Sequence, residues 1–548
     1  MAIIGSSSAK WSSDKVVQRR VDYDNHIQPM VEQRDQLLLG GGENAIARQH
    51  SKGRLTARER IDLLKDNETE LMEFGIFAAW GMYADYGSPA GAGVITGLIK
   101  VGGQECVVVA NDATVKAGAY FEVTLKKNLR AQQIALENHL PVIYLVDSAG
   151  VFLPLQDQVF PDEAHFGRIF YNNARLSALG VHQIAAVMGP CVAGGAYLPV
   201  MCDKYVMVDG AYMFLAGPAL VKAAIGQDID AETLGGATTH NAISGTADYH
   251  EENDEAALER IREIMGNINH PVERAFLRHK ELAPRLPSED IPGLIYPPGE
   301  TQYDFHEILA RLLDNSEFTE YKATYGQTLI CGTGRIGGYS VGIVGNQKMS
   351  TRTGEGEMQI GGVIYSDSAD KAARFVMNCN QDRIPIIFFH DVNGFMVGKT
   401  AEWDGIAKDG AKLVNAVANS VVPKITVVIG GSYGAGNYAL CGRAYNPRFM
   451  YAWPTAKIAV MGGAQAANTL AEIQLARIPD ATAEDRARIV QEVQARYDVQ
   501  ADPRYAAARM WIDEIIYPEE TRDVLIRSLA ACDHQTKMPA PVFGVLQV

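Results

Sequence analysis

The sequence contains an internal duplication, and this feature constrains the fold more than any single motif does. Residues 97–111 (GLIKVGGQECVVVAN) match residues 332–346 (GTGRIGGYSVGIVGN) at a constant offset of 235 positions, which aligns their glycine pairs. Residues 184–200 match residues 425–441 at an offset of 241 positions, and each is an apolar stretch that runs into glycines. The chain is therefore expected to fold as two copies of one unit.

Each copy has the same predicted order of elements: a strand, a helix, a strand ending in a glycine turn, a helix, and another strand ending in a glycine turn. Apolar strands alternating with helices are typical of an α/β fold with crossover connections. Five prolines fall between Pro284 and Pro298, and this stiff segment is the predicted linker. The predicted parts are an N-terminal extension, a first domain, the linker and a second domain, at residues 1–45, 46–283, 284–300 and 301–548.

Composition excludes two classes of partner. The chain has 50 Lys and Arg against 65 Asp and Glu, a formal charge of −15, which disfavours nucleic acid. Residues 181–201 are the most membrane-like stretch, but they contain polar side chains, prolines and glycines, so we predict no membrane span. The seven cysteines form no CxxC pair, which predicts a reducing compartment and no metal site. We expect the cytoplasm, or the mitochondrial matrix for a eukaryotic chain.

The glycine turns carry the functional signal. They follow apolar strands at corresponding places in both copies, for example at Gly194 and at Gly434. Glycine lets the backbone approach a ligand closely, and two or more oriented N–H groups form an oxyanion hole that stabilises a developing enolate or tetrahedral oxygen. Two such holes predict two polarised carbonyl groups.

Eight longer stretches carry a family resemblance. They are NDATVKAG (111–118), FPDEAHFGRIFYNNA (160–174), CVAGGAYLP (191–199), FLAGPALVKAAIG (214–226), GFMVG (394–398), GIAKDGAKLVNAVA (405–418), GGSYGAGNYALCGRAYNPRF (430–449) and VMGGAQAAN (460–468). In these stretches the chain resembles the carboxyltransferase β subunit of biotin-dependent acyl-CoA carboxylases, particularly the 3-methylcrotonyl-CoA carboxylase type. The resemblance covers roughly residues 45–548.

The resemblance implies a fold and an assembly. Members of this family have two tandem crotonase-like domains, of which the first binds acyl-CoA and the second binds carboxybiotin. Their active site lies between the first domain of one subunit and the second domain of another, so a homodimer is the minimum and a hexamer is typical. They join a biotin carboxylase or biotin carrier subunit that holds the biotin. The cofactors implied are therefore biotin on a partner and a coenzyme A thioester as substrate.

The resemblance also implies site residues. The first hole would hold the thioester oxygen as the enolate forms, and the second would hold the ureido oxygen of biotin. We assign Ala149, Gly150, Gly194 and Gly195 to the first hole and Gly434 and Ala435 to the second, with Gly394, Phe395 and Gly436 beside the biotin. Lys116, Arg168 and Arg175 are candidates for the CoA phosphates, and Val151, Phe166, Phe170 and Tyr171 for the acyl pocket.

The chain departs from the 3-methylcrotonyl type in two places. The turn after Asp147 reads SAGVFLPLQ where that type usually has SGGAxLPRQ, which bears on the acyl pocket. Residues 348–362 (KMSTRTGEGEMQIGG) lengthen the second copy, and their acidic, glycine-rich character predicts a loop.

Several alternatives stay open. A geranyl-CoA, propionyl-CoA or acetyl-CoA carboxylase β subunit would keep the chemistry and change the acyl group. A glutaconyl-CoA decarboxylase α subunit would reverse it, transferring carboxyl to biotin. A crotonase-type hydratase or isomerase would need an acidic residue beside the thioester, and Asp147, Asp162, Glu163 and Asp391 lie near the turns. A non-catalytic CoA-binding scaffold is the last reading.

Overall fold

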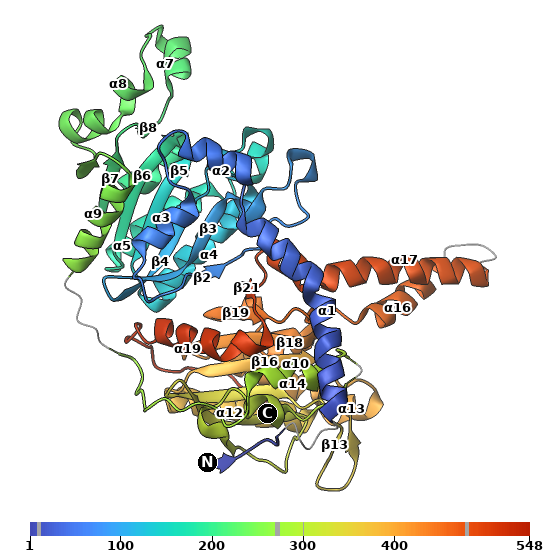
Figure 1. The fold of residues 1–548 in the computed structure, drawn as a ribbon. Helices are drawn as coiled ribbons and strands as arrows, with labels where there is room; N and C mark the ends of the chain where they lie inside the picture. Colours follow the sequence, from blue (N-terminus) through green and yellow to red (C-terminus); the bar gives the residue numbers. More distant parts are fainter. Residues whose placement is uncertain (8–12, 269–273, 300, 477–481, 548) are drawn as a thin grey trace. The chain divides into compact units, whose positions relative to one another are not determined.

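The computed structural model describes residues 1–7, 13–268, 274–299, 301–476 and 482–547, which fall into two compact units. We call Glu32–Glu273 with Ala507–Met510 the N-terminal unit. The C-terminal unit comprises Met1–Val31, Arg274–Ala506 and Trp511–Val548. Figure 1 shows the ribbon, coloured along the chain.

The N-terminal unit is built on an eight-stranded sheet in the order β2-β3-β4-β5-β6-β7-β9, with β8 also paired to β6. The ladders β2-β3 and β3-β4 are antiparallel, and the others are parallel. The strands are β2 (Met72–Phe74), β3 (Val94–Val101), β4 (Gln104–Asn111), β5 (Val142–Ser148), β6 (Gln183–Val192), β7 (Lys204–Val208), β8 (Tyr212–Phe214) and β9 (Tyr249–Glu251).

Helices cover this sheet. Helices α3 and α9 pack against each other and against its strands, as Figure 1 shows, and α4 packs against α5. A capping box formed by Thr56 and Glu59 begins α3. The helices are α2 (Glu43–His50), α3 (Ala57–Leu64), α4 (Glu122–Asn138), α5 (Phe166–Ala178), α6 (Tyr197–Val200), α7 (Pro218–Ile225), α8 (Ala231–Gly235) and α9 (Asp254–Gly266).

The C-terminal unit has a nine-stranded sheet in the order β1-β10-β11-β12-β16-β18-β19-β21, with β20 paired to β18. Two small ladders, β13-β14 and β15-β17, lie outside it. The strands are β1 (Ala2–Ile3), β10 (Glu317–Glu320), β11 (Leu329–Ile336), β12 (Tyr339–Asn346), β13 (Thr351–Arg352), β14 (Met358–Gln359), β15 (Val363–Ile364), β16 (Ile386–Val392), β17 (Gly394–Phe395), β18 (Lys424–Tyr433), β19 (Phe449–Ala452), β20 (Lys457–Ala459) and β21 (Glu514–Ile515).

The helices of this unit enclose an apolar core. Leu413 of α14 and Phe388 of β16 are fully buried in it, beside α12 residues such as Val376. The helices outside the N-terminal unit are α10 (Ile291–Ile295), α11 (Phe305–Leu309), α12 (Ser366–Gln381), α13 (Lys399–Trp403), α14 (Ile406–Ala418), α15 (Gly434–Ala439), α16 (Gly463–Leu475), α17 (Ala483–Ala501) and α19 (Thr521–Cys532), and the last two residues of α18 (Pro503–Ala508) group with the N-terminal unit. Helix α1 (Ser13–Leu38) crosses the boundary between the units in sequence.

The two sheets repeat the same topology, which confirms the predicted α/β class and duplication. The hairpin β3-β4 closes with Val101 opposite Gln104, and β11-β12 closes with Ile336 opposite Tyr339 at the predicted offset of 235. Both glycines of each turn have positive φ, as a type I′ turn requires. The glycine pairs are therefore turn residues in both units.

The predicted domain boundaries stay a prediction. By its contacts, the proline-rich segment groups with the C-terminal unit. It contains α10, whose Ile291, Leu294 and Ile295 are buried.

Candidate functional site

The pairing of two central strands breaks at the same place in both units. Between β5 and β6, Val146 pairs with Val187, but Ser148 pairs with Cys191. Between β16 and β18, His390 pairs with Val428, but Val392 pairs with Ser432. A bulge re-aims the chain that follows it, and here each bulge precedes a glycine turn.

The turn after each bulged strand opens a short helix. In the N-terminal unit, Ala193 begins the 3₁₀ turn η6 (Ala193–Ala196) with φ of 55°. In the C-terminal unit, Gly434 begins α15 with φ of 52°. The first N–H groups of a helix have no intrahelical acceptor, so Gly194, Gly195 and Ala435 lie where donors are available to a ligand.

Sequence reasoning missed Ala193. It stands at the position of Gly434, since both residues follow their bulged strands directly and share the left-handed conformation. Alanine rarely adopts this conformation, so a search for glycines passes over it. The comparison of the two units was the signal that would have found it.

The predicted donors after β5 already have acceptors in the same unit. The N–H of Ala149 donates to Ala117 O at 2.9 Å, and the N–H of Gly150 donates to Ser148 Oγ at 3.0 Å. Gly150 O accepts from Tyr120 N. These bonds fasten the turn after β5, so the helix start after β6 is the better candidate for donors to a ligand in this unit.

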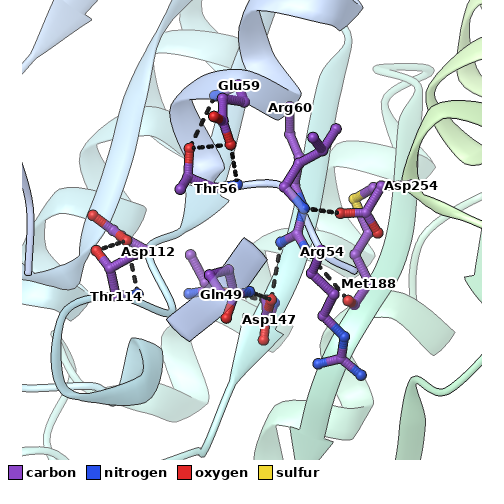
Figure 2. A network of polar contacts seen from close by, with 12 residues as sticks. Gln49, Arg54, Thr56, Glu59, Arg60, Asp112, Thr114, Asp147, Met188 and Asp254 are labelled. Carbon is purple, nitrogen blue, oxygen red and sulfur yellow. Dashed lines mark hydrogen bonds and ion pairs between the residues drawn. The ribbon is translucent and has the colours of Figure 1, made fainter. Parts of the chain in front are cut away.

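A buried aspartate, Asp147, lies near the end of β5 in the N-terminal unit. Figure 2 shows Arg60 of α3 between Asp147, at the end of β5, and Asp254, at the start of α9. Its guanidinium donates to Asp147 at 3.0 Å, to Asp254 at 2.8 Å and to Met188 O at 3.3 Å. Gln49 donates to the same oxygen of Asp147. Burial raises the pKa of Asp147, and Arg60 opposes this shift.

The matching aspartate of the C-terminal unit has different partners. Asp391 accepts from Lys348 Nζ at 2.8 Å, from Tyr303 OH at 2.8 Å and from Gly431 N at 2.9 Å. The side chains of Asp391, Lys348 and Tyr303 are nearly fully buried. The neighbouring His390 is also buried between Ser432 Oγ and Leu440 O, and burial lowers its pKa to about 4.

The segment around Gly394 and Phe395 forms a second turn in the C-terminal unit. Its strand β17 pairs with β15, so Phe395 lies opposite Ile364. The N–H of Asn393 donates to Gly362 O at 2.7 Å. Space beside Gly394 is open, since a Cβ there would meet no atom within 4 Å. In contrast, a Cβ on Gly436 would lie 2.6 Å from Val392, so Gly436 allows close packing.

Two of the predicted acyl-pocket aromatics gather near the first glycine turn. Phe166 packs 5.3 Å from Phe170, ring centre to ring centre, and Phe170 packs 5.7 Å from Tyr197, which follows η6 directly. Tyr171 lies apart from this cluster, exposed beneath the guanidinium of Arg168. Val151, the fourth predicted residue, forms an isolated bridge with Tyr120.

Two of the predicted phosphate ligands lie together. Arg168 and Arg175, both on α5, line a pocket of about 520 Å³ with Gln132 and Asn172. Lys116 lies elsewhere, exposed on the 3₁₀ turn η4 (Lys116–Gly118).

Two searches of the described residues complete the description. Over these residues, no group of three or more His, Cys, Asp or Glu side chains is placed to hold a metal ion. Within the same ranges, none of the helices is both long and apolar enough to cross a membrane.

Comparison with known proteins identifies the family. The carboxyl transferase domain matches residues 48–546. The biotin-dependent 3-methylcrotonyl-coenzyme A carboxylase beta1 subunit of Mycobacterium tuberculosis is 47% identical over 520 residues, covering 93% of this chain and 95% of that one. The mitochondrial methylcrotonoyl-CoA carboxylase beta chain of Dictyostelium discoideum is 45% identical over 534 residues, covering 96% and 88%.

A solved structure agrees with these relatives. The beta subunit of geranyl-CoA carboxylase from P. aeruginosa superposes over the whole of both chains with a TM-score of 0.87 and 34% identity. This likeness confirms the predicted tandem fold, and the family match confirms the predicted recognition. The chain belongs to the carboxyl transferase domain family of enzymes.

Proposed function

We propose that the chain is the carboxyltransferase β subunit of a biotin-dependent acyl-CoA carboxylase that converts 3-methylcrotonyl-CoA into 3-methylglutaconyl-CoA. The observation that carries this proposal is the repeated arrangement of bulge, left-handed residue and helix start after β6 and β18. The substrate follows the names of the relatives at 45–47% identity.

The first turn would act on the thioester. The N–H groups of Gly194 and Gly195 would donate to its oxygen as the enolate forms, and such a donor is worth about 3 kcal/mol in the transition state. A side chain on either glycine would meet open space, so the backbone is accessible there. The aromatic cluster of Phe166, Phe170 and Tyr197 would hold the acyl chain. Ala149 and Gly150 would shape this hole through the bonds that fasten their turn.

The second turn would act on biotin. When bound, carboxybiotin supplies CO₂ and, through its ureido nitrogen, the base that takes the acyl-CoA proton. The C-terminal unit fits this group, since Gly434 and Ala435 present helix-start N–H groups and the space beside Gly394 is open. These N–H groups would donate to the ureido oxygen, with Phe395 beside it and Gly436 allowing the turn to pack.

The coenzyme A phosphates would bind at α5. Arg168 and Arg175 share a pocket there, and guanidinium groups suit phosphate oxygens. Lys116 is a third candidate for binding a phosphate. It lies on η4, where Ala117 O accepts from the N–H of Ala149. The acyl pocket would also include Val151, whereas Tyr171 lies apart from it, beneath the guanidinium of Arg168.

The proposed partners follow from the proposed carboxyltransferase function. The chain would assemble as a homo-oligomer, at least a dimer and up to a hexamer, with a biotin carboxylase or biotin carrier subunit. We place it in the cytoplasm, or in the mitochondrial matrix for a eukaryotic source, since the relatives from Dictyostelium discoideum and Drosophila melanogaster are named as mitochondrial proteins.

Geranyl-CoA is the second candidate substrate. The structural likeness to a geranyl-CoA carboxylase beta subunit favours it. The higher identity to 3-methylcrotonyl-CoA enzymes favours the first candidate.

The test is a substrate panel. The chain is co-expressed with candidate biotin carboxylase and carrier subunits, and incorporation of labelled bicarbonate is measured with 3-methylcrotonyl-, geranyl-, propionyl- and acetyl-CoA. Preference for 3-methylcrotonyl-CoA supports the proposal. No incorporation with any of the four, together with transfer of carboxyl from glutaconyl-CoA to biotin, would show that the enzyme is a decarboxylase. Hydration or isomerisation of an acyl-CoA without biotin would show that the enzyme is not a carboxyltransferase.

A further inference from the structure

A buried carboxylate occupies the bulge beside each glycine turn. Where the pairing of β16 and β18 breaks, Asp391 Oδ1 accepts from the N–H of Gly431, three residues before Gly434. The backbone is pressed against this carboxylate, because a Cβ on Gly430 would lie 2.4 Å from it. The carboxylate therefore takes the place of a missing strand partner at the bulge and fixes the backbone of β18 at Gly430 and Gly431.

The same arrangement recurs in the N-terminal unit. A Cβ on Gly189 would lie 2.1 Å from Asp147, at the corresponding bulge. The residue that corresponds to Gly431 is Pro190, which has no N–H to donate. Asp147 is held by Arg60 and Gln49 instead. The position of the carboxylate persists while its partners differ, which points to a role for the position.

Lys348 connects Asp391 to the turn proposed to bind biotin. It opens the 348–362 segment, which returns so closely that a Cβ on Gly361 would lie 2.2 Å from Lys348 O. At that base, Gly362 N donates to Gln347 O, and Gly362 O accepts from Asn393 N. The ammonium of Lys348 thus sits at the junction of three pieces: the bulge, the segment and the Gly394 turn.

We propose that Asp391, held by Lys348 and Tyr303, is a positioning residue that fixes the Gly394 and Gly434 turns of the C-terminal unit. This inference rests on the proposed function and assigns the 348–362 segment the task of anchoring the biotin side. Asp147 with Arg60 has the corresponding task on the acyl-CoA side. Each network acts through backbone placement and touches no substrate itself.

The test is the reverse half-reaction, transfer of carboxyl from 3-methylglutaconyl-CoA to free biotin by the full chain. Asp391→Asn and Lys348→Met are expected to lower kcat/KM for biotin about 10–100-fold, the effect of a misplacement near 1 Å. KM for the acyl-CoA should stay within about twofold of wild type. Asp147→Asn should give the opposite pattern, with the acyl-CoA parameters changed.

Conservative and control variants separate positioning from folding. Lys348→Arg keeps the charge and should restore most of the biotin parameter. Tyr303→Phe, which removes one O–H donor, should give a smaller change and serves if Asp391→Asn does not fold. Asp314→Asn is the matched control. Asp314 is also buried and accepts from Gly337 N and Gly338 N, but it lies at the β11-β12 hairpin and not at the turns after β16 and β18. It should lower stability and leave both KM values unchanged.

The outcomes are distinct. If the wild-type chain transfers no carboxyl to biotin from any acyl-CoA, the proposed function fails. If the wild type is active but Asp391→Asn and Lys348→Met change both substrates equally, as a general loss of folded protein would, the positioning role is overturned.

Discussion

The two units place a carboxylate at the same bulge and neutralise it in different ways. In the N-terminal unit, Asp147 depends on Arg60, which also holds Asp254. In the C-terminal unit, Asp391 has a lysine, a tyrosine hydroxyl and a backbone N–H. The difference shows that the geometry of the bulge was retained after duplication while its polar partners were exchanged.

The largest expected effect compares the two cations. Arg60→Met leaves two buried carboxylates without their cation and should lower the free energy of unfolding by about 3–5 kcal/mol. Lys348→Met should cost about 1–3 kcal/mol, because Gly431 N and Tyr303 OH still donate to Asp391. Urea unfolding measures both values. Equal losses would mean that the remaining donors of the C-terminal unit contribute little.

The next comparison concerns the glycines of the two turns. Gly436→Val should destabilise the protein by about 1–3 kcal/mol, since its side chain would overlap Val392. Gly195→Val should change stability by less than about 0.5 kcal/mol, because its Cβ would meet open space. Thermal unfolding of both variants measures these two changes in stability. Similar melting temperatures would contradict the predicted difference between Gly436 and Gly195.

The third comparison concerns the aspartates that accept from the glycine N–H groups of the two hairpin turns, Asp66 and Asp314. Asp66 accepts from Gly102 N and Gly103 N, as Asp314 does in the other unit, but their side chains are 23% and 4% exposed. Asp314→Ala should therefore cost about 1–3 kcal/mol and Asp66→Ala about 0.5–1.5 kcal/mol. Denaturant midpoints at constant m-value decide the order, and the reverse order would show that burial does not govern these anchors.

The last comparison is a pH dependence found at one bulge, which develops only below about pH 6.5. His390 has its pKa lowered to about 4 by burial, whereas Val146 occupies the matching position. Below about pH 6.5 the unfolded chain takes up a proton that the folded chain refuses, so stability falls as pH drops toward 4. His390→Val should flatten this slope between pH 6.5 and 4. An unchanged slope would assign the acid sensitivity to other groups.

Much of this fold could be predicted because its signals are local. The glycine pairs at Gly102 and Gly337 set the offset, the hairpins and the duplication. Asp147 and Arg60 are 87 residues apart, and Asp391 and Lys348 are 43 apart, so no local pattern joins them. Ala193 was missed because its conformation comes from the bulge before it rather than from its own preference.

The central claim is that the turn after β6 acts on the acyl-CoA through its backbone. The most direct measurement is labelled carboxyl transfer by the assembled enzyme with Gly195→Val, alongside Gly266→Val, a substitution at another glycine with open space around it in the same unit. We predict a loss of about 100-fold or more for Gly195→Val at an unchanged melting temperature, because its side chain would fill the open space through which the thioester oxygen reaches the N–H groups, and wild-type transfer for Gly266→Val. Undiminished transfer by a folded Gly195→Val enzyme would contradict the account.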